Sequence, residues 1–283
     1  MVGGEAAVVL RVEREQCGAT GEHRGEVRVV GDGREVVRRL LGVAEIGAEL
    51  GAQEILAASD AVRYPGHGFS VVNTLVEYRQ GRQTDSSSLM VYSRADASGQ
   101  FRNLVRFVAP ARDAGKLMLY SGRDLWFHDP AQRATVRLSP QQRLLGQASN
   151  GDVVTVNLAR DYQATDSGQE EVADGERVRR NCHRLTLAGR TAEAAYHRIE
   201  LWVTVDGHRP VKARYLADSG ALLKTAYFRR YADVLGVQRP TETVIIDGLE
   251  PGWVTVMRLS DWTRREVPEA WLQRDHLPRF QPD

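Results

Sequence analysis

Short stretches in which apolar and polar residues alternate dominate the chain from residue 69 onward, and this pattern predicts β-strands. Turn-forming pairs such as Asp206-Gly207 and Asp247-Gly248 separate the strands. Because no long helices intervene, the pattern predicts an antiparallel meander rather than βαβ units. The expected strands cover residues 69–80, 88–93, 102–108, 116–120, 124–129, 135–138, 182–187, 199–205, 211–217, 222–231, 241–246 and 253–261.

Helical spacing of apolar residues is confined to a few segments. Residues 53–62 predict a helix, which Pro65-Gly66 ends. Helical segments are also expected at residues 141–145, after Asn150, and in a C-terminal piece that begins at Pro268. Residues 153–156 are mostly β-branched, so propensity alone would make them a strand.

A meander of about eleven strands has to curl, because each strand twists relative to its neighbour. The fold expected is therefore mainly β, an incomplete antiparallel β-barrel with a few covering helices. Alternation places Ile199, Leu201 and Val203 on one face and Trp202 on the other. Two interpretations of the apolar face remain open, an ordinary filled core and a cavity that accepts a lipid.

Composition narrows the possible functions. Apolar residues make up 42% of the 283 residues, so the chain can form a core, and its formal net charge of +1 gives no general attraction for nucleic acid. No apolar run approaches the ~20 residues that cross a bilayer, so no membrane span is expected. Two cysteines, Cys17 and Cys182, cannot form a disulfide framework.

Catalytic and metal-binding motifs are not found in the sequence. It contains no H-E-x-x-H, G-x-S-x-G, P-loop or G-x-G-x-x-G pattern, and no two of its seven histidines stand at helical spacing. We therefore predict a protein that is not an enzyme, with no catalytic residues, no metal and no cofactor.

Residues 1–50 differ from the rest, because they contain no Trp, Tyr or Phe. Residues 36–44 resemble the basic end and apolar core of a signal peptide, but Glu45 and Glu49 interrupt it. Two interpretations stay open, a degraded export signal and a loosely ordered extension. The domain prediction is an N-terminal segment at 1–50 and one β-rich domain at 51–283.

Four stretches carry a family resemblance across residues 52–280. In these stretches the chain resembles the outer-membrane lipoprotein-sorting family, the LolA/LolB-like group of periplasmic lipid-handling proteins. Together they occur in the right order through the whole β region. The stretches are residues 105–115, residues 124–130, residues 143–152 with Asp161-Tyr162, and residues 198–203 with Pro210-Val211 and 222–225.

The resemblance implies an incomplete barrel whose mouth is covered by helices around an apolar cavity. It implies a monomeric periplasmic carrier that binds acyl chains of lipoproteins or other lipids and passes them toward the outer membrane. It also implies a partner of the RND or MMPL exporter type. Residues 53–62 and 144–158 are expected to form the lid.

Candidate lipid-binding residues follow from the apolar faces and the resemblance. For Trp126 and Trp202 the alternative is packing on the exterior beneath a helix. The candidates are Phe69, Val71, Leu104, Phe107, Leu117, Leu119, Trp126, Leu144, Leu145, Leu201 and Trp202.

A second function fits the same architecture. An RseB-like module senses stray lipoproteins and binds a partner protein, and we expect such a sensor to carry a second folded domain. Only a short aromatic-free segment is expected outside the half-barrel here, which favours the carrier. A filled structural barrel that serves an exporter is the third alternative.

Overall fold

The computed structural model describes residues 50–122, 124–191 and 194–282, so the prediction for the N-terminal segment falls outside them except at Leu50. The helices are α2 (Ala52–Arg63), α3 (Asn150–Val153), α4 (Leu158–Asp161) and the 3-10 helices η1 (Glu269–Leu272) and η2 (Arg274–Arg279). The strands are β1 (Phe69–Arg79), β2 (Arg82–Ala95), β3 (Phe101–Ala109), β4 (Leu117–Ser121), β5 (Asp124–Asp129), β6 (Ala134–Leu138), β7 (Arg143–Leu145), β8 (Ala148–Ser149), β9 (Tyr162–Ala173), β10 (Arg179–Gly189), β11 (Arg198–Thr204), β12 (Pro210–Leu216), β13 (Leu222–Val234), β14 (Val237–Asp247) and β15 (Trp253–Arg264).

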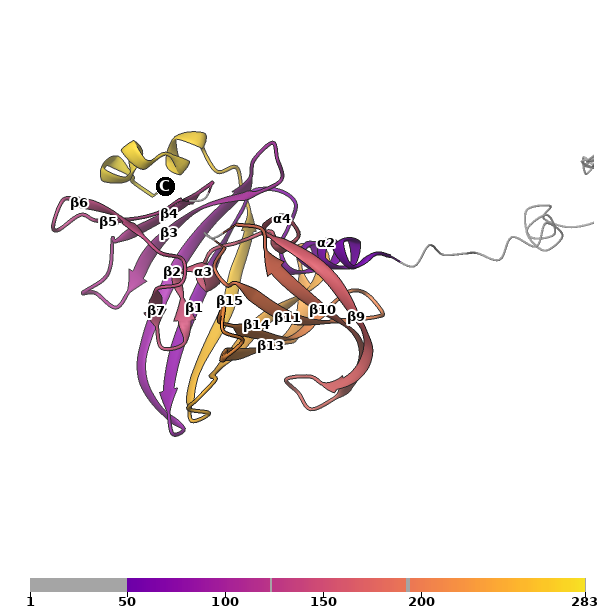
Figure 1. The fold of residues 1–283 in the computed structure, drawn as a ribbon. Coiled ribbons are helices and arrows are strands. Elements are labelled where there is room, and N and C mark those ends of the chain that lie inside the picture. The colour runs from indigo at the N-terminus through magenta and orange to yellow at the C-terminus, as the bar shows by residue number, and fades with distance from the viewer. Residues whose placement is uncertain (1–49, 123, 192–193, 283) are drawn as a thin grey trace, which may run out of the picture. The chain divides into compact units, whose positions relative to one another are not determined.

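Thirteen of these strands form one antiparallel sheet in the order β6-β5-β4-β3-β2-β1-β15-β14-β13-β12-β11-β10-β9. The sheet curls but does not close, since β6 and β9 stay at its two edges within the described part of the chain (Figure 1). The predicted incomplete antiparallel barrel is confirmed. Twelve of its thirteen strands correspond to the expected segments, and the thirteenth, the largely polar edge strand β9, was not predicted.

The path of the chain explains how one face of the sheet is covered. β1 to β6 build the sheet outward in one direction, and β9 to β15 return until β15 pairs with β1. The connection from β6 to β9 therefore has to run from one edge to the other. It contains the β7–β8 hairpin, α3 and α4, and its apolar residues pack into the main core cluster.

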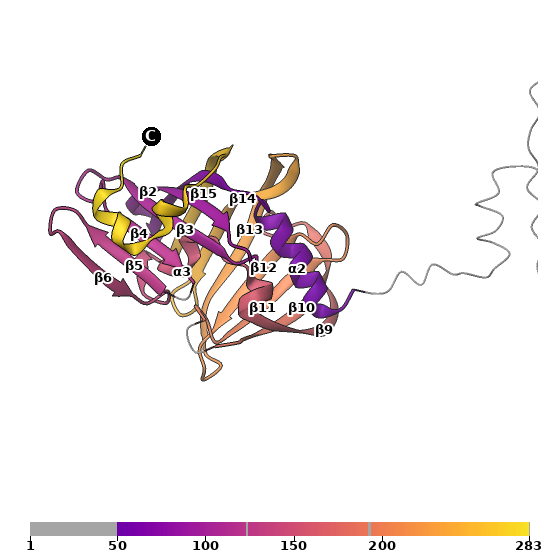
Figure 2. The same cartoon turned by 90° about the horizontal axis from the view of Figure 1, so that it is seen from above.

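The sheet has an inner face, on which this connection and α2 lie, and an outer face. The inner face carries the main core cluster, which includes Phe69, Leu75 and Leu185. On the outer face, residues 265–280 lie over β3, β4 and β5 (Figure 2) and bury a second cluster. We call this segment the C-terminal cover; its apolar residues are Val267, Trp271, Leu272, Leu277 and Phe280.

The local predictions for the connecting segments were partly wrong. Residues 141–145 were expected to be helical, but Arg143–Leu145 is strand β7, which pairs with β8. The turn between them depends on Gly146, which has a φ of +54° and lies so close to Thr255 that a Cβ would be 2.3 Å from its Oγ1. Residues 153–156 form no strand. Helix α3 instead begins after Ser149, its N-cap residue, and ends at Val153. Asp152 accepts hydrogen bonds from the Ser149 N–H and hydroxyl and so stabilises the start of this helix.

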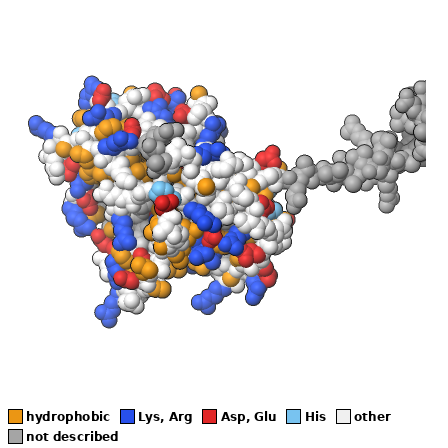
Figure 3. Space-filling view, viewed as in Figure 1, with side chains coloured by type: hydrophobic (Ala, Val, Ile, Leu, Met, Phe, Trp, Pro, Cys, Tyr) orange, Lys and Arg blue, Asp and Glu red, His pale blue; other side chains and the backbone are white. Residues whose placement is uncertain are grey.

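Charged side chains of both signs are dispersed over the surface seen in Figure 3. On the outer face, buried Glu242 accepts hydrogen bonds from Arg229 at 2.5 Å and Arg258 at 2.8 Å. Such pairing keeps a polar outer face without an uncompensated buried charge. Within the described residues, no helix is both long and apolar enough to cross a membrane.

Candidate functional site: an apolar cavity beneath a two-part lid

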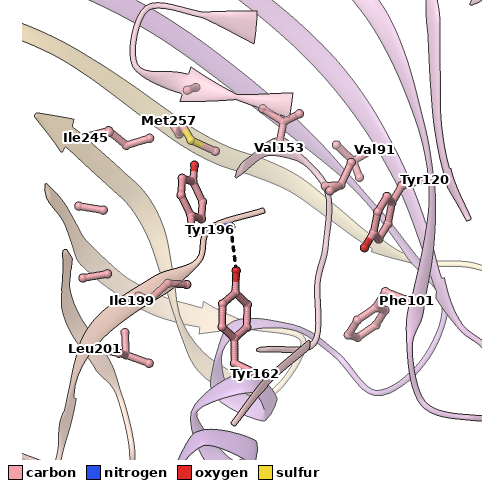
Figure 4. Close-up of a cluster of buried hydrophobic side chains, with 14 of the residues drawn as sticks. Val91, Phe101, Tyr120, Val153, Tyr162, Tyr196, Ile199, Leu201, Ile245 and Met257 are labelled. Atoms are coloured by element: carbon pink, nitrogen blue, oxygen red, sulfur yellow. Dashed lines mark hydrogen bonds between the residues drawn. The ribbon is translucent and has the colours of Figure 1, made fainter. Parts of the chain in front are cut away.

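A cavity of about 230 Å³ lies between the inner face of the sheet and the segments that cover it. Figure 4 shows side chains pointing toward this region from both halves of the sheet and from the segments beside it. Val91 on β2, Tyr120 on β4 and Val153 on α3 lie across from Ile199 and Leu201 on β11 and from Tyr196 just before it. Most of the lining is apolar. The strands contribute Val71, Val91, Ile199, Leu201, Ala213, Tyr215, Ala226, Phe228, Ile245, Met257 and Leu259.

Small side chains in one row of the sheet create the space. Leu201 pairs with Ala213, Ala213 with Ala226, and Ala226 with Ile245, so two alanines are adjacent in the middle of a row across β11 to β14. Both alanines are 1% exposed and line the cavity. Larger side chains at these positions would fill the space, since cores otherwise pack without voids.

The covering segments form a lid, which we define as α2 together with residues 150–161. Its first part, α2, buries Ile55 and Leu56 against the inner face. Its last turn is capped from the sheet, because Arg239 Nη1 donates to the carbonyls of Ala61 at 2.8 Å and Val62 at 2.9 Å.

Polar contacts join the two parts of the lid. The Gln53 amide donates to the carbonyl of Ala159 at 2.7 Å and to that of Tyr162 at 3.2 Å, and accepts from the Ala164 N–H at 3.0 Å. Asp60 accepts from the Ala159 N–H at 2.8 Å. The junction between α2 and α4 is therefore made mainly by side chain to backbone hydrogen bonds.

Asp60 and Arg63 place a buried ion pair beside the cavity. Arg63 Nη1 lies 3.0 Å from Asp60 Oδ1, and Arg63 also lines the cavity. Burial raises the pKa of Asp60 to about 6, although the neighbouring guanidinium acts in the opposite direction. This carboxyl thus titrates near neutral pH.

A second buried polar network fixes the other part of the lid to the sheet. Lys224 from β13 donates to the Asp152 carboxylate and, at 3.0 Å, to the Gln147 carbonyl. The Tyr196 hydroxyl donates to Asp152 Oδ1 at 2.9 Å, and its backbone N–H donates to the Tyr162 hydroxyl at 3.1 Å (Figure 4). Burial lowers the pKa of Lys224 and raises those of both tyrosines.

This network brings together two of the stretches that carry the family resemblance. Asp152 comes from the third stretch, Tyr162 is part of the same stretch's downstream pair, and Lys224 belongs to the fourth. Their shared role in the structure is to hold the lid on the sheet.

The predicted lipid-binding residues are divided among three regions. Val71 and Leu201 line the cavity. Phe69, Phe107, Leu144 and Leu145 belong to the core cluster around it, without lining it. Five others pack on the outer face: Leu104, Leu117, Leu119 and Trp126 with the C-terminal cover, and Trp202 with Cys182 and Val211.

Sequence reasoning missed the polar and small residues of the cavity. The rings of Tyr196 and Tyr215, whose centres are 4.4 Å apart and whose planes are tilted by 48°, form part of one wall, and Asn73 lines the cavity from β1. A signal was present for Asn73, because a lone polar residue stands among apolar ones on the buried side of a strand. In the part of the chain that the structure describes, no three His, Cys, Asp or Glu residues are grouped as a metal site would need.

Comparison with known proteins places these features in a family. A family model described as "Uncharacterized protein" matches residues 99–279. Two solved structures share the fold at low identity. One is a DUF1329 family protein from Desulfovibrio piger (22% identity, TM-score 0.67, 80% of this chain and 97% of that one). The other is a putative outer membrane lipoprotein-sorting protein domain from Vibrio parahaemolyticus (17% identity, TM-score 0.68, 81% of this chain and 98% of that one).

No curated protein matches the sequence. The structure of a LolA superfamily protein from Nitrosomonas europaea is 31% identical, with a TM-score of 0.72, and the alignment covers 80% of this chain and 99% of that one. The chain belongs to the LolA superfamily.

Proposed function

We propose that the protein is a carrier that binds the acyl chains of lipoproteins or other lipids in the cavity beneath its lid. The observation that supports this proposal most directly is the apolar cavity on the inner face, next to a pair of buried alanines. A folded core normally fills such a space with its own side chains. Here the sheet leaves it open and the lid covers it.

The expected binding energy is large for each carbon atom buried. A CH₂ group gains about 0.8 kcal/mol when it leaves water. The cavity of about 230 Å³ exceeds the ~150 Å³ of an engineered cavity that binds benzene, and is below the ~300 Å³ at which pockets for larger ligands begin. The cavity therefore has room for part of an acyl chain, and a whole chain requires the lid to move outward.

Release requires that the empty protein regain part of this energy. When the lid closes, Ile55, Leu56, Val153 and Val154 are buried again on the inner face. The net affinity for a lipid is the difference between the loaded and the closed empty states. The lid of the proposed carrier thus consists of α2 and residues 150–161, which overlaps the predicted segments 53–62 and 144–158.

The proposal includes a place and a partner. Membership of the LolA superfamily supports a periplasmic location, and the Vibrio relative is named for outer membrane lipoprotein sorting. In this proposal the protein acts as a monomer, and an RND or MMPL-type exporter supplies or receives the lipid.

Filling the cavity tests the proposal. Ala226→Phe should place a ring in the cavity, so the binding of a fluorescent fatty acid should fall at least about tenfold while the thermal midpoint stays the same or rises. Ala232→Phe is the matched control, since Ala232 is exposed on the same strand. Equal binding by wild type and both variants would exclude the cavity as the lipid site, and no binding by wild type would exclude the carrier.

A further inference from the structure

One polar side chain that lines the cavity has an acceptor atom without a partner. Asn73 on β1 is 2% exposed and lines the cavity. Nothing in the described part of the chain donates a hydrogen bond to its Oδ1. Several other buried polar atoms in the described ranges also lack a partner, but Asn73 is the only residue among them that lines the cavity.

The sheet around Asn73 offers no partner for the carboxamide. Its neighbours along the strand on the same face are Val71 and Leu75. Directly across from it are Leu89 on β2 and Leu259 on β15. All four side chains are apolar, so a hydrogen bond to this group has to come from the cavity side.

Retaining an asparagine there carries a cost. A buried polar group without a partner destabilises a protein, and a leucine at the same position would avoid that cost. Most polar groups in the lid are paired, as for Gln53 and Asp152. The contrast points to a ligand in the cavity as the hydrogen-bonding partner of Asn73.

We propose that Asn73 selects lipids that carry a hydrogen-bonding group, a hydroxyl or an amide, within the part that enters the cavity. This inference rests on the proposed function and deepens it. A carboxamide has an acceptor and a donor on adjacent atoms, and a hydroxyl or an amide can satisfy both. An unsubstituted hydrocarbon chain would leave the Asn73 oxygen desolvated, which lowers its affinity relative to the substituted lipid.

The test compares stearic acid with three probes of equal chain length: a stearic acid hydroxylated next to the carboxyl group, one hydroxylated at mid-chain, and an N-acyl amide. Wild-type protein should bind at least one substituted probe about tenfold more tightly than stearic acid, as one buried hydrogen bond predicts. Which probe is preferred distinguishes a hydroxylated lipid from an amide-linked one. Asn73→Leu should abolish the preference and bind stearic acid at least as tightly as wild type.

Controls separate this inference from the carrier proposal. Thr243→Val alters another polar residue of the lining on β14 and should leave the preference intact. The empty Asn73→Leu protein should melt at the same or a higher temperature, and a lower midpoint would show that Asn73 has a structural partner and overturn the inference. Equal binding of all four probes by wild type would also overturn it while leaving the carrier standing. If the wild-type protein bound none of the four probes, both this inference and the carrier proposal would be refuted.

Discussion

Two covers lie on opposite faces of the same sheet, and they are attached by different physical means. The C-terminal cover buries aromatic rings: Trp271 lies 5.2 Å from Tyr92 and 4.9 Å from Phe280, ring centre to ring centre. The lid also buries apolar side chains, among them Ile55 and Leu56, but buried hydrogen bonds and ion pairs such as those of Gln53 and Asp152 contribute to its attachment as well. Water can replace a hydrogen bond at little net cost, but it cannot replace apolar contact.

On the proposed carrier function, the contrast predicts that the lid is the cover that opens. Removing the C-terminal cover would expose aromatic surface to water, so this cover should remain in place as long as the protein is folded. The lid can exchange many of its protein contacts for contacts with water. A cover of that kind suits the filling and emptying of the cavity that the proposed carrier requires. Three substitutions and one change of pH test the difference between the two covers.

The largest effect is expected from Trp271→Ala. Removing this buried ring should lower the free energy of unfolding by about 4 kcal/mol, measured by urea denaturation. Leu249→Ala, at a side chain that is 88% exposed, is the control and should change it little. Because Trp271 is not part of the cavity lining, the folded variant should bind a fatty-acid probe as wild type does. A change in binding would mean that the two covers are coupled.

Lys224→Met should come next. It leaves the Asp152 carboxylate buried without its cation, and breaking a buried pair in this way costs about 3 kcal/mol. Arg179→Met breaks an exposed pair with Glu171 and should cost less than about 1 kcal/mol in the same denaturation experiment. Similar losses in the two variants would contradict the assignment of the Asp152 network as the anchor of the lid.

Gln53→Leu should have a smaller effect on stability and a clear effect on the lid. Three hydrogen bonds between α2 and the segment around α4 are lost, for about 2 kcal/mol in total. Amide hydrogens of α2 should exchange faster, and uptake of a fatty-acid probe should accelerate. Gln83→Leu, at an exposed position of β2, is the control and should change neither rate. If exchange in α2 were unchanged, the lid would not be held by this residue.

The smallest effect is a dependence of stability on pH through Asp60. Burial raises the pKa of this carboxyl from 3.8 to about 6 in the folded protein, so the folded state holds the proton more tightly than the unfolded state. Its contribution to stability is therefore fully present below pH 3.8 and is lost as the pH rises through 6. Wild type should lose about 1 kcal/mol between pH 5 and pH 7 relative to Asp60→Asn, measured by urea denaturation at both values. Parallel curves for the two proteins would refute the assignment.

Most of the fold could be predicted from the sequence because β-strand alternation and turns are local. Residues 53–62 and most strands were predicted from patterns that hold within a few residues. The edge strand β9 was missed because it is polar on both faces, so its pairing with β10 has no apolar signature. Residues 141–145 were wrongly assigned to a helix. Their hairpin depends on the close approach of Gly146 to Thr255, which is distant in the sequence, so no local pattern reveals it.

The site was less predictable, since a strand that is apolar on both sides does not reveal which side faces inward. In β4, Leu117 and Leu119 pack on the outer face beneath the C-terminal cover, whereas Met118 and Tyr120 lie on the inner face. The presence of the C-terminal cover decides this, and no local pattern in β4 encodes it. In β11 the alternation placed Leu201 and Trp202 on opposite faces without indicating which face is the inner one; in the structure Leu201 lines the cavity and Trp202 packs on the outer face.

The single carboxylate of Asp152 receives hydrogen bonds from Ser149, Tyr196 and Lys224, which are far apart in the sequence. Substitutions at these positions cannot then accumulate in any order. If Lys224 is lost first, the carboxylate of Asp152 stays buried without its cation. If Asp152 is lost first, the ammonium group of Lys224 stays buried without its anion, so either order passes through a less stable protein. Lineages that keep this lid are expected to change positions 152 and 224 as a pair, or to leave both alone.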